Sequence, residues 1–481
     1  MGGGLDYRCQ KPMKQVTSWG GYRSDAKSIM ARREHLTAPL PTAKMPPSVP
    51  YILANEAAER FAFYGLSAIL VVFMTRNLLG PGGVPAVMAD ESAKAWFHWF
   101  TAAVYFMAIV GAVISDAWLG KFKTIVAFSL VYCAGLFFLS RDHTRLGLAG
   151  GLTLIAIGSG IIKPCVSANV GDQFGPSNKH LIERVYSWFY FSINVGAGVS
   201  QWLCPVLLEK SGPLAGFGVP AVFMVLATVA YWLGRRRLVD IPPAGKLNWR
   251  EMLDREQAVT LGKLCIIFLF VSMFFALFYQ SQSAWVLQAQ KMNLTWMGID
   301  WLPAQMQVAN SLLVLVMIPA FSYAVYPALN RVWTMTPLRK MGLGMLVTAG
   351  SFLVPIWIET QIQKGGQPSI GWQFFAYVFL TAAEILVSIT ALEFAYTQAP
   401  KKMKSLIQSI YLLSISLGNI IAAVVNLAIS NPDGTSKLPG ASYYWFFAIA
   451  MTVTTLLFIP IARWYRQREY IQDEATAATQ Q

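Results

Sequence analysis

Three charged side chains lie inside an apolar run that is long enough to cross a membrane. The run covers about residues 51–74, and Glu56, Glu59 and Arg60 fall in its first half. At a rise of about 1.5 Å per residue they would lie roughly 8–14 Å along the helix, where each ionisable group costs roughly 2.5–3.5 kcal/mol. A turn of about 100° per residue places all three on one face. That face must turn toward protein or a water-filled cavity, and such buried charge is typical of a substrate or proton pathway.

The composition favours a membrane protein over a soluble one. Of the 481 residues, 55% are hydrophobic and 13% are charged, whereas soluble proteins average about 25% charged residues. The net charge of +14 could suggest a nucleic-acid partner, but lysine and arginine lie in short clusters between apolar runs, which is the pattern of membrane loops. The sequence therefore predicts an all-α, polytopic integral membrane protein that binds no nucleic acid.

About twelve apolar runs have spanning length, and they divide into two sets of six. The first set occupies about 51–74, 96–118, 122–140, 147–170, 185–208 and 216–234. The second set occupies about 261–284, 304–327, 341–359, 370–395, 405–429 and 441–463. A polar, basic stretch that contains Pro242 and Pro243 separates the two sets. Two sets of spans joined by a linker are typical of a transporter built from two related halves.

This division predicts five segments, of which two are helical bundles. They are a disordered basic cytoplasmic arm (1–49), a six-helix bundle (50–234), a cytoplasmic linker (235–260), a second six-helix bundle (261–465) and a cytoplasmic tail (466–481). Basic clusters, such as Lys121 with Lys123 and Lys401 with Lys402, fall in the loops that share a side with the N-terminus. By the positive-inside rule, we expect both termini in the cytoplasm. We also expect the protein to lie in the cell membrane.

Nothing in the sequence predicts an enzyme or a bound cofactor. The cysteines show no metal-ligand spacing and imply no disulfide framework. No phosphate-binding loop and no nucleophile–base pair is evident. We therefore expect no catalytic residue, no metal and no cofactor.

A lysine in the fourth span needs an acidic partner. Lys163 lies in the segment Gly158-Ser-Gly-Ile-Ile-Lys-Pro164, with apolar sequence on both sides. The small residues allow a neighbouring helix to approach, and the proline loosens the local backbone. One alternative is a lysine that keeps its ammonium at the membrane interface. Otherwise Glu56 or Glu59 is the obvious partner.

The tenth span carries a carboxylate deep inside the C-terminal half. This residue, Glu384, is the only acid well inside that half, and the alternative to a functional role is a structural, hydrogen-bonded carboxylate. Arg60 and Lys163 would form a cationic wall in the N-terminal half, opposite this anionic wall. Such a cavity suits a zwitterion of fixed length, with its carboxylate at the cations and its ammonium at Glu384.

The second span adds a histidine and a tyrosine on one helix face. His98 and Tyr105 lie seven residues apart, which corresponds to about two helical turns. A histidine changes charge near physiological pH and can therefore take part in proton coupling. The alternative is a histidine at the membrane edge, beside Trp96 and Trp99.

Four segments together resemble the proton-coupled oligopeptide transporter family (POT or PTR) of the major facilitator superfamily. The segment from Glu56 to Gly65 resembles the family's ExxERFxYYG, and GSGIIKPCVSANVGDQF at 158–174 resembles its GxGGIKPCVxAxGGDQF. The segment 189–196 is similar to FYxxINxG, and 384–419 looks like the animal branch of the family. The match covers about 50–465 and implies a fold of about twelve transmembrane helices in two six-helix bundles.

The resemblance implies how a substrate would bind. Arg60 and Lys163 would receive the C-terminal carboxylate of a peptide, and Glu384 would receive its N-terminal amine. The residues implied to line the rest of the peptide site are Tyr64, Tyr105, Asn194 and Asn310.

The resemblance also implies proton coupling. Glu56 and Glu59 would take part in it and pair with Lys163, and His98 falls where animal-like members carry a proton-linked histidine. The implied function is a proton symporter that imports di- and tripeptides by alternating access. Its partners would be small peptides, protons and the lipid bilayer, and we expect a monomer.

Three departures from the family pattern weaken the expectation of a peptide substrate. Ser67 replaces a usual arginine, Tyr279 replaces a usual carboxylate in the seventh span, and Tyr411 replaces a usual tryptophan. Losing the arginine weakens the carboxylate site, and losing the acid removes one proton site linked to a gate. One alternative keeps fold and coupling but transports nitrate, an organic anion or a modified amino acid. The others are an integral-membrane enzyme and a nutrient sensor that transports nothing.

Overall fold

The computed structural model describes residues 36–39, 41–243, 245, 255–398 and 404–465. In this part of the chain the structure is helical apart from one short hairpin of β1 (Thr295–Trp296) and β2 (Ile299–Asp300), which pair antiparallel, and isolated bridges. The all-α fold expected from the sequence is confirmed. The expected tail (466–481), most of the arm (1–35) and much of the linker (246–254) lie outside the described residues.

The first half of the chain forms long helices joined by short turns. They are α2 (Val49–Arg76), α3 (Asp90–Ile114), α4 (Lys121–Arg141), α5 (Arg145–Asp172) and α6 (Ile182–Leu233). Short turns of other helix types are η1 (Pro81–Gly83), η2 (Ser115–Leu119), η3 (Pro176–Leu181) and η4 (Gly234–Arg236). The helix α6 contains a break at Gly212, whose φ of 75° is left-handed. This break falls in the gap expected between the spans at 185–208 and 216–234.

The second half is more often interrupted. Its helices are α8 (Arg255–Phe278), α9 (Ala284–Ala289), α10 (Val308–Ala320), α11 (Tyr326–Val332), α12 (Pro337–Ser351), α13 (Leu353–Gln363), α14 (Gly371–Glu384), α15 (Thr390–Thr397), α16 (Lys404–Ile429) and α17 (Ala441–Trp464). Short turns are η5 (Tyr279–Gln282), η6 (Pro303–Gln307), η7 (Phe321–Val325) and η8 (Ile385–Ile389). The turns η7 and η8 are π-helical and continue α10 and α14 into α11 and α15.

The described residues contain 11 helical stretches that are long and apolar enough to cross a membrane. One of these, Arg184–Arg236, is 53 residues long and includes the break at Gly212. Because a span needs about 20 residues, this stretch accounts for two crossings. The chain is therefore a multi-pass membrane protein, in agreement with the expectation of about twelve spans.

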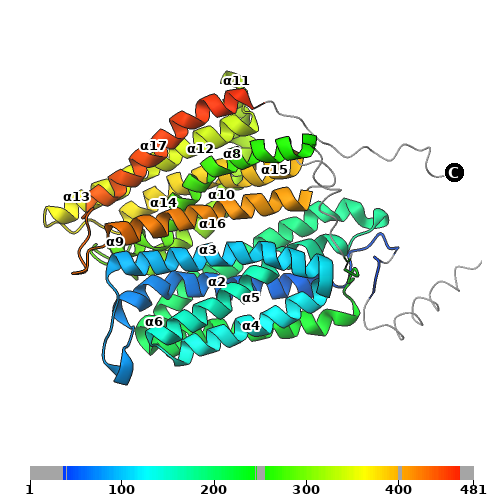
Figure 1. The fold of residues 1–481 in the computed structure, drawn as a ribbon, viewed down its shortest axis with the longest axis horizontal. Coiled ribbons are helices and arrows are strands. Elements are labelled where there is room, and N and C mark those ends of the chain that lie inside the picture. The colour runs from blue at the N-terminus through cyan, green and yellow to red at the C-terminus, as the bar shows by residue number, and fades with distance from the viewer. Residues whose placement is uncertain (1–35, 40, 244, 246–254, 399–403, 466–481) are drawn as a thin grey trace, which may run out of the picture.

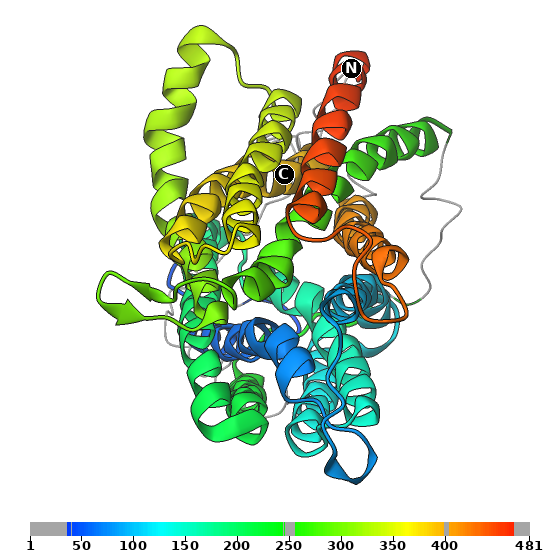
Figure 2. The same ribbon diagram turned by 90° about the vertical axis from the view of Figure 1, so that its left-hand side faces the viewer.

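The helices form two groups that lie side by side (Figures 1 and 2). The helices α2 to α6 make one group, and α8 to α17 make the other. The helix α3 packs along α16, and α6 contacts α10, so these pairs join the two groups. The site described below lies at this junction.

Glycines allow α5 to pack between α3 and α4 at backbone distance. A Cβ atom on Gly160 would lie 2.4 Å from the carbonyl oxygen of Val104 in α3, and one on Gly158 would lie 2.6 Å from the backbone nitrogen of Tyr132 in α4. These are the small residues of the segment that contains Lys163. They fix the register of that lysine against the neighbouring helices.

We expect Gly160→Ala to lower the melting temperature of the detergent-solubilised protein. The added methyl group would overlap the α3 backbone, and overpacking of this kind costs roughly 1–3 kcal/mol. Gly218→Ala in α6 is the matched control, because a Cβ atom there meets nothing within 4 Å. It should leave stability unchanged or slightly higher, since alanine favours helix. Equal melting temperatures for the two variants would contradict the close approach.

Part of the expected disordered arm packs against the rest of the protein. Leu36 forms a parallel bridge with Val239, and its carbonyl accepts a hydrogen bond of 2.7 Å from the backbone nitrogen of Asp240. The Asn178 side chain donates to the carbonyl of Lys44 at 3.4 Å. The described residues of the arm thus differ from the expectation, because backbone groups after α6 and a side chain near η3 pair with them.

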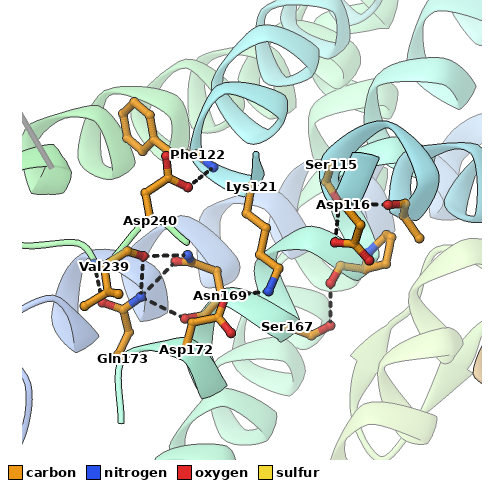
Figure 3. Close-up of polar contacts among 12 residues, drawn as sticks. Ser115, Asp116, Lys121, Phe122, Ser167, Asn169, Asp172, Gln173, Val239 and Asp240 are labelled. Carbon is orange, nitrogen blue, oxygen red and sulfur yellow. Dashed lines mark hydrogen bonds and ion pairs between the residues drawn. The ribbon is translucent and has the colours of Figure 1, made fainter. Parts of the chain in front are cut away.

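A polar network joins the end of α5, the start of α4 and the segment after α6 (Figure 3). The ammonium of Lys121 lies 2.5 Å from Asp172, and the Gln173 side chain bonds both the carbonyl and the nitrogen of Val239. Asp240 accepts a hydrogen bond of 3.2 Å from the backbone nitrogen of Phe122. This network lies at the turn after the second span.

Candidate functional site

The charged residues of α2 form a buried cluster on one helix face. Arg60 Nε lies 2.7 Å from Glu56 Oε1 and 3.0 Å from Glu59 Oε2. The side chains of both acids are 2% exposed, whereas that of Arg60 is 12% exposed. The four-residue spacing places Glu56 beside the guanidinium, and Glu59 reaches it from the adjacent position. One cation therefore balances two buried acids only in part.

Lys163 supplies the second cation from α5. Its ammonium lies 4.0 Å from Glu59 Oε1 and 3.8 Å from the centre of the Phe63 ring. Among the described residues its nitrogen has no hydrogen-bond partner. Among the described residues Glu59 is therefore the acid nearest to Lys163, and Glu56 interacts with this lysine over a longer distance. Glu56 lies one turn from Arg60 and bonds that residue.

A serine hydroxyl also hydrogen-bonds to this cluster of four charged side chains. Ser159 Oγ donates to Glu59 Oε1 at 3.3 Å. Glu56 and Glu59 carry two negative charges and Arg60 and Lys163 carry two positive charges, so the cluster is neutral when all four are ionised. The ammonium of Lys163 has no hydrogen-bond partner among the described residues. It is therefore the group in the cluster best placed to bind an additional anion.

Glu384 lies on the opposite group of helices, at the end of α14. It is half-buried, and the Asn310 amide of α10 donates to its Oε2 at 2.8 Å. The same amide group also donates to Thr381 Oγ1 at 3.0 Å. Tyr64 and Tyr105 lie within electrostatic range of both Arg60 and Glu384. The two tyrosines are therefore close enough to both charged groups to contact a solute that reaches from one to the other.

Hydrogen bonds between the two groups of helices hold one end of the junction together. We call this the closed end; it carries the loops 77–89 and 430–440. The Tyr279 hydroxyl donates to the Tyr105 hydroxyl at 2.6 Å, and Ser311 donates to Gln201 at 2.9 Å. Tyr279, which stands where the family usually has a carboxylate, therefore still links the two groups of helices. It does so through a hydrogen bond between two neutral hydroxyl groups.

His98 is also part of this closed end. Its side chain is fully buried, with Nδ1 at 2.8 Å from Asn419 Oδ1 and Nε2 at 3.1 Å from Ser283 Oγ. The alternative of a histidine at the membrane edge is therefore wrong. The two partners belong to the opposite group of helices and were not identified from the sequence. Asn419 is a polar residue within an apolar span, which is the signal that could have identified it.

A cation at the closed end was also missed by sequence reasoning. Lys94 Nζ lies 2.6 Å from Glu91 in the same helix and 3.7 Å from the centre of the Tyr443 ring in α17. Both charged side chains are less than one-tenth exposed. This buried pair is a further contact between the two groups of helices.

A cavity lies between the groups on the opposite side of the site. It measures about 480 Å³ and extends from Lys163 toward Asp116 and Lys121. Lining residues from the second group are Leu392, Ser409, Tyr411 and Leu412. We call this the open end. A smaller cavity of about 400 Å³ lies between the groups at the closed end, beside Lys94 and Tyr443. The larger cavity brings the ammonium of Lys163 into contact with a space that a small solute could enter.

The remaining predicted residues occupy different positions. Asn194 donates to the carbonyl of Tyr190 within α6. The backbone of α6 approaches α2 closely two residues later, where a Cβ atom on Gly196 would lie 3.1 Å from Arg60 Cβ. Ser67 is 2% exposed in α2, and the Tyr411 hydroxyl lies 3.0 Å from Ser388 Oγ. The described residues contain no group of three or more histidine, cysteine or acidic side chains that could hold a metal ion.

Comparison with protein families gives a match over most of the chain. The model described as the POT family matches residues 122–252 and 244–446. Peptide transporter family 1 of Drosophila melanogaster is 35% identical over 371 residues, which are 67% of this chain and 49% of that protein. Solute carrier family 15 member 2 of Rattus norvegicus is 32% identical over 74% of this chain and 56% of that protein. The chain thus spans about half the length of these curated relatives.

Solved structures match over more of the chain. The crystal structure of an auto-inhibited POT family peptide transporter is similar with a TM-score of 0.80 and 32% identity, over 89% of this chain and 99% of that one. The structure of the POT family transporter PepTSo gives a TM-score of 0.79 and 33% identity, over 88% and 99%. Both alignments cover the two groups of helices.

Proposed function

The chain belongs to the POT family of the major facilitator superfamily, and we propose that it imports di- and tripeptides together with protons. The family consists of transporters and not of enzymes. The observation that carries this proposal is the pair of opposed walls. A cationic pair, Arg60 and Lys163, belongs to one group of helices, and Glu384 belongs to the other. Tyr64 and Tyr105 lie within electrostatic range of both Arg60 and Glu384. A short peptide zwitterion has the matching charges at its two ends.

In the proposed binding mode, the peptide carboxylate meets Lys163 first. The ammonium of this residue has no hydrogen-bond partner among the described residues, whereas Arg60 is held by two acids. The peptide amine meets the Glu384 oxygen that Asn310 leaves free. Tyr64, Tyr105 and Asn194 then contact the peptide between its ends.

The proposed cycle alternates between two arrangements of the helix groups. Residues 50–234 and 261–465 would move as two bundles, joined by the linker at 235–260. The contacts at the closed end would open toward the outside, and the cavity at the open end would face the cytoplasm, where both termini would lie. We propose the cell membrane as the site of action and the monomer as the working unit.

Proton coupling would use the buried acids and the histidine. Glu56 and Glu59 share Arg60, and a proton on one of them would release part of that cation to the peptide carboxylate. A proton bound by His98 would disturb its contacts with Asn419 and Ser283 and so weaken the closed end. A proton that falls through about 150 mV releases roughly 3.5 kcal/mol, which supports roughly 300-fold accumulation of a neutral solute.

One observation favours a second candidate function. Ser67 is buried at the position of a usual arginine, so the carboxylate site has one cation fewer than expected for the family. The same fold and coupling could then serve nitrate, an organic anion or a modified amino acid. Glu384 weighs against a simple anion, since its charge would face the solute.

We expect purified protein in proteoliposomes to accumulate a labelled dipeptide when an inward proton gradient is imposed. An uncoupler should abolish the accumulation, because the proton gradient is its only source of free energy. A sodium gradient at constant pH is the matched control and should drive nothing. Uptake that follows sodium and ignores pH would contradict proton coupling, and nitrate uptake without peptide uptake would favour the second candidate.

A further inference from the structure

A groove with a basic rim lies between α12 and α17, away from the transport site. It measures about 620 Å³. The two helices that line it run next to each other (Figure 1). Its apolar wall consists of Leu338, Gly342, Leu343, Leu346, Phe458, Ile459 and Ala462. Its rim consists of Trp333, Arg339, Arg463 and Tyr465, together with Thr336 and Thr455 within the groove.

The groove continues into a surface that lies at membrane depth. Leu346 is 52% exposed and Ile459 is 42% exposed, and Leu456 beside them is 61% exposed. Large apolar side chains this exposed on spanning helices face the hydrocarbon of the bilayer. An occupant of the groove would therefore come from the bilayer and not from the water.

The basic rim lies where the helices leave the membrane. The guanidinium of Arg339 lies 5.1 Å from the centre of the Trp333 ring and donates to the carbonyl of Thr334 at 2.8 Å. Lys340 lies over the Tyr326 ring and Lys263 near the Trp464 ring, at 4.2 Å and 5.6 Å. Aromatic rings with cations beside them are typical of the interface, where lipid head groups lie.

We propose that this groove binds one anionic phospholipid. The phosphate would lie between Arg339 and Arg463, and one acyl chain would follow the apolar wall between α12 and α17. Arginine forms paired hydrogen bonds with phosphate oxygens, and the two side chains come from different helices, so a phosphate would bridge them. The absence of a side chain at Gly342 leaves room for the chain beside Phe458.

The charge requirement is tested by counting bound lipid. Purified full-length protein in a nonionic detergent is titrated with dioleoyl phosphatidylglycerol or dioleoyl phosphatidylcholine, and bound lipid is counted by native mass spectrometry. We expect the anionic lipid to bind more tightly. Each of Arg339→Gln and Arg463→Gln should weaken it about fivefold, since a basic residue near an anionic lipid contributes about 1 kcal/mol. Arg236→Gln, an exposed arginine outside the groove, should change nothing.

The groove itself is tested by filling it. A Cβ atom on Gly342 would lie 3.5 Å from the Phe458 ring, which is an ordinary contact, so leucine there should fold and occupy the chain's place. Gly350→Leu in the same helix is the matched control, because a Cβ atom there meets nothing within 4 Å. We expect Gly342→Leu to reduce binding of phosphatidylglycerol at least tenfold, and Gly350→Leu to leave it unchanged.

Three outcomes would overturn the proposal. Equal binding of the two lipids would exclude a role for the charged rim, and equal losses in Arg236→Gln and Arg339→Gln would make the attraction general to the surface. Competition by glycerol 3-phosphate at lipid-like concentrations, with Gly342→Leu unaffected, would identify a site for free phosphate compounds and not for lipid. The thermal shift produced by added lipid gives a second readout, since a ligand of the folded state raises its melting temperature.

Discussion

Lys163→Ala is expected to abolish proton-driven peptide uptake and leave the protein folded. The cluster of Glu56, Glu59, Arg60 and Lys163 is neutral when all four are ionised. Without the lysine, one unit of negative charge stays buried, which is costly unless a proton removes it. A proton held permanently by the cluster cannot be exchanged during the cycle, and the peptide carboxylate also loses its free ammonium. Folding should survive, because Arg60 and Ser159 still bond Glu59.

The measurement compares driven uptake with peptide exchange at equal pH on both sides. Lys163→Ala should reduce driven uptake to the level of empty liposomes, and any remaining exchange should no longer depend on pH. Lys364→Ala removes an exposed lysine after α13 and serves as the matched control. Normal uptake driven by the proton gradient in a monodisperse Lys163→Ala protein would show that this residue is not needed for coupling.

The spacing of charged residues predicted the α2 cluster correctly, but it could not identify the partner of Lys163. Glu56, Glu59 and Arg60 belong to one helix, so a period of about 3.6 residues is enough to place them together. Choosing between the two acids for Lys163 requires the register of α5 against α2. The close backbone contacts at Gly158 and Gly160 fix α5 against α4 and α3. The position of Lys163 relative to α2 then depends on how these helices pack together, which the sequence does not show.

The contacts between the two groups of helices were beyond sequence reasoning. The histidine at position 98 bonds Asn419, which is 321 residues away, and Ser283, which is 185 residues away. The sequence predicted a histidine that could take part in proton coupling, but it showed neither the burial of this side chain nor its partners. The same holds for Tyr279, which was interpreted as the loss of a charged site and forms a hydrogen bond with Tyr105. Such pairs form only in a conformation in which the two groups of helices meet at this end, and the sequence of each helix alone does not show how the groups meet.

The membrane spans were predicted well because their signal is length and apolarity. The break of α6 falls within the predicted gap between 208 and 216. The π-helical turns η2, η7 and η8 were not predicted, since one residue inserted in a turn leaves hydrophobicity unchanged. The turn η8 begins directly after Glu384, and π turns inside helices often occur at functional sites.

Glu384→Gln is expected to weaken the binding of a dipeptide such as Ala-Ala roughly 10- to 150-fold. The substitution keeps the shape of the side chain and an oxygen that can accept the bond from Asn310, which is 2.8 Å long. It removes the negative charge that would bind the peptide amine. A hydrogen bond to a charged group contributes roughly 1.5–3 kcal/mol, and 1.4 kcal/mol corresponds to a factor of about ten.

The cause of this loss is tested with a second ligand that has no charged amine. N-acetylated Ala-Ala should bind poorly to the unchanged protein and lose little more affinity in Glu384→Gln. Its acetylated nitrogen carries no positive charge, so removing the carboxylate takes away no ion pair. Competition by both peptides in both proteins forms a double-mutant cycle, whose coupling energy isolates the contact between amine and carboxylate. If both peptides lose the same affinity on mutation, Glu384 does not bind the amine. The proposed binding mode for a zwitterion would then fail, and the alternative of anion transport would gain support.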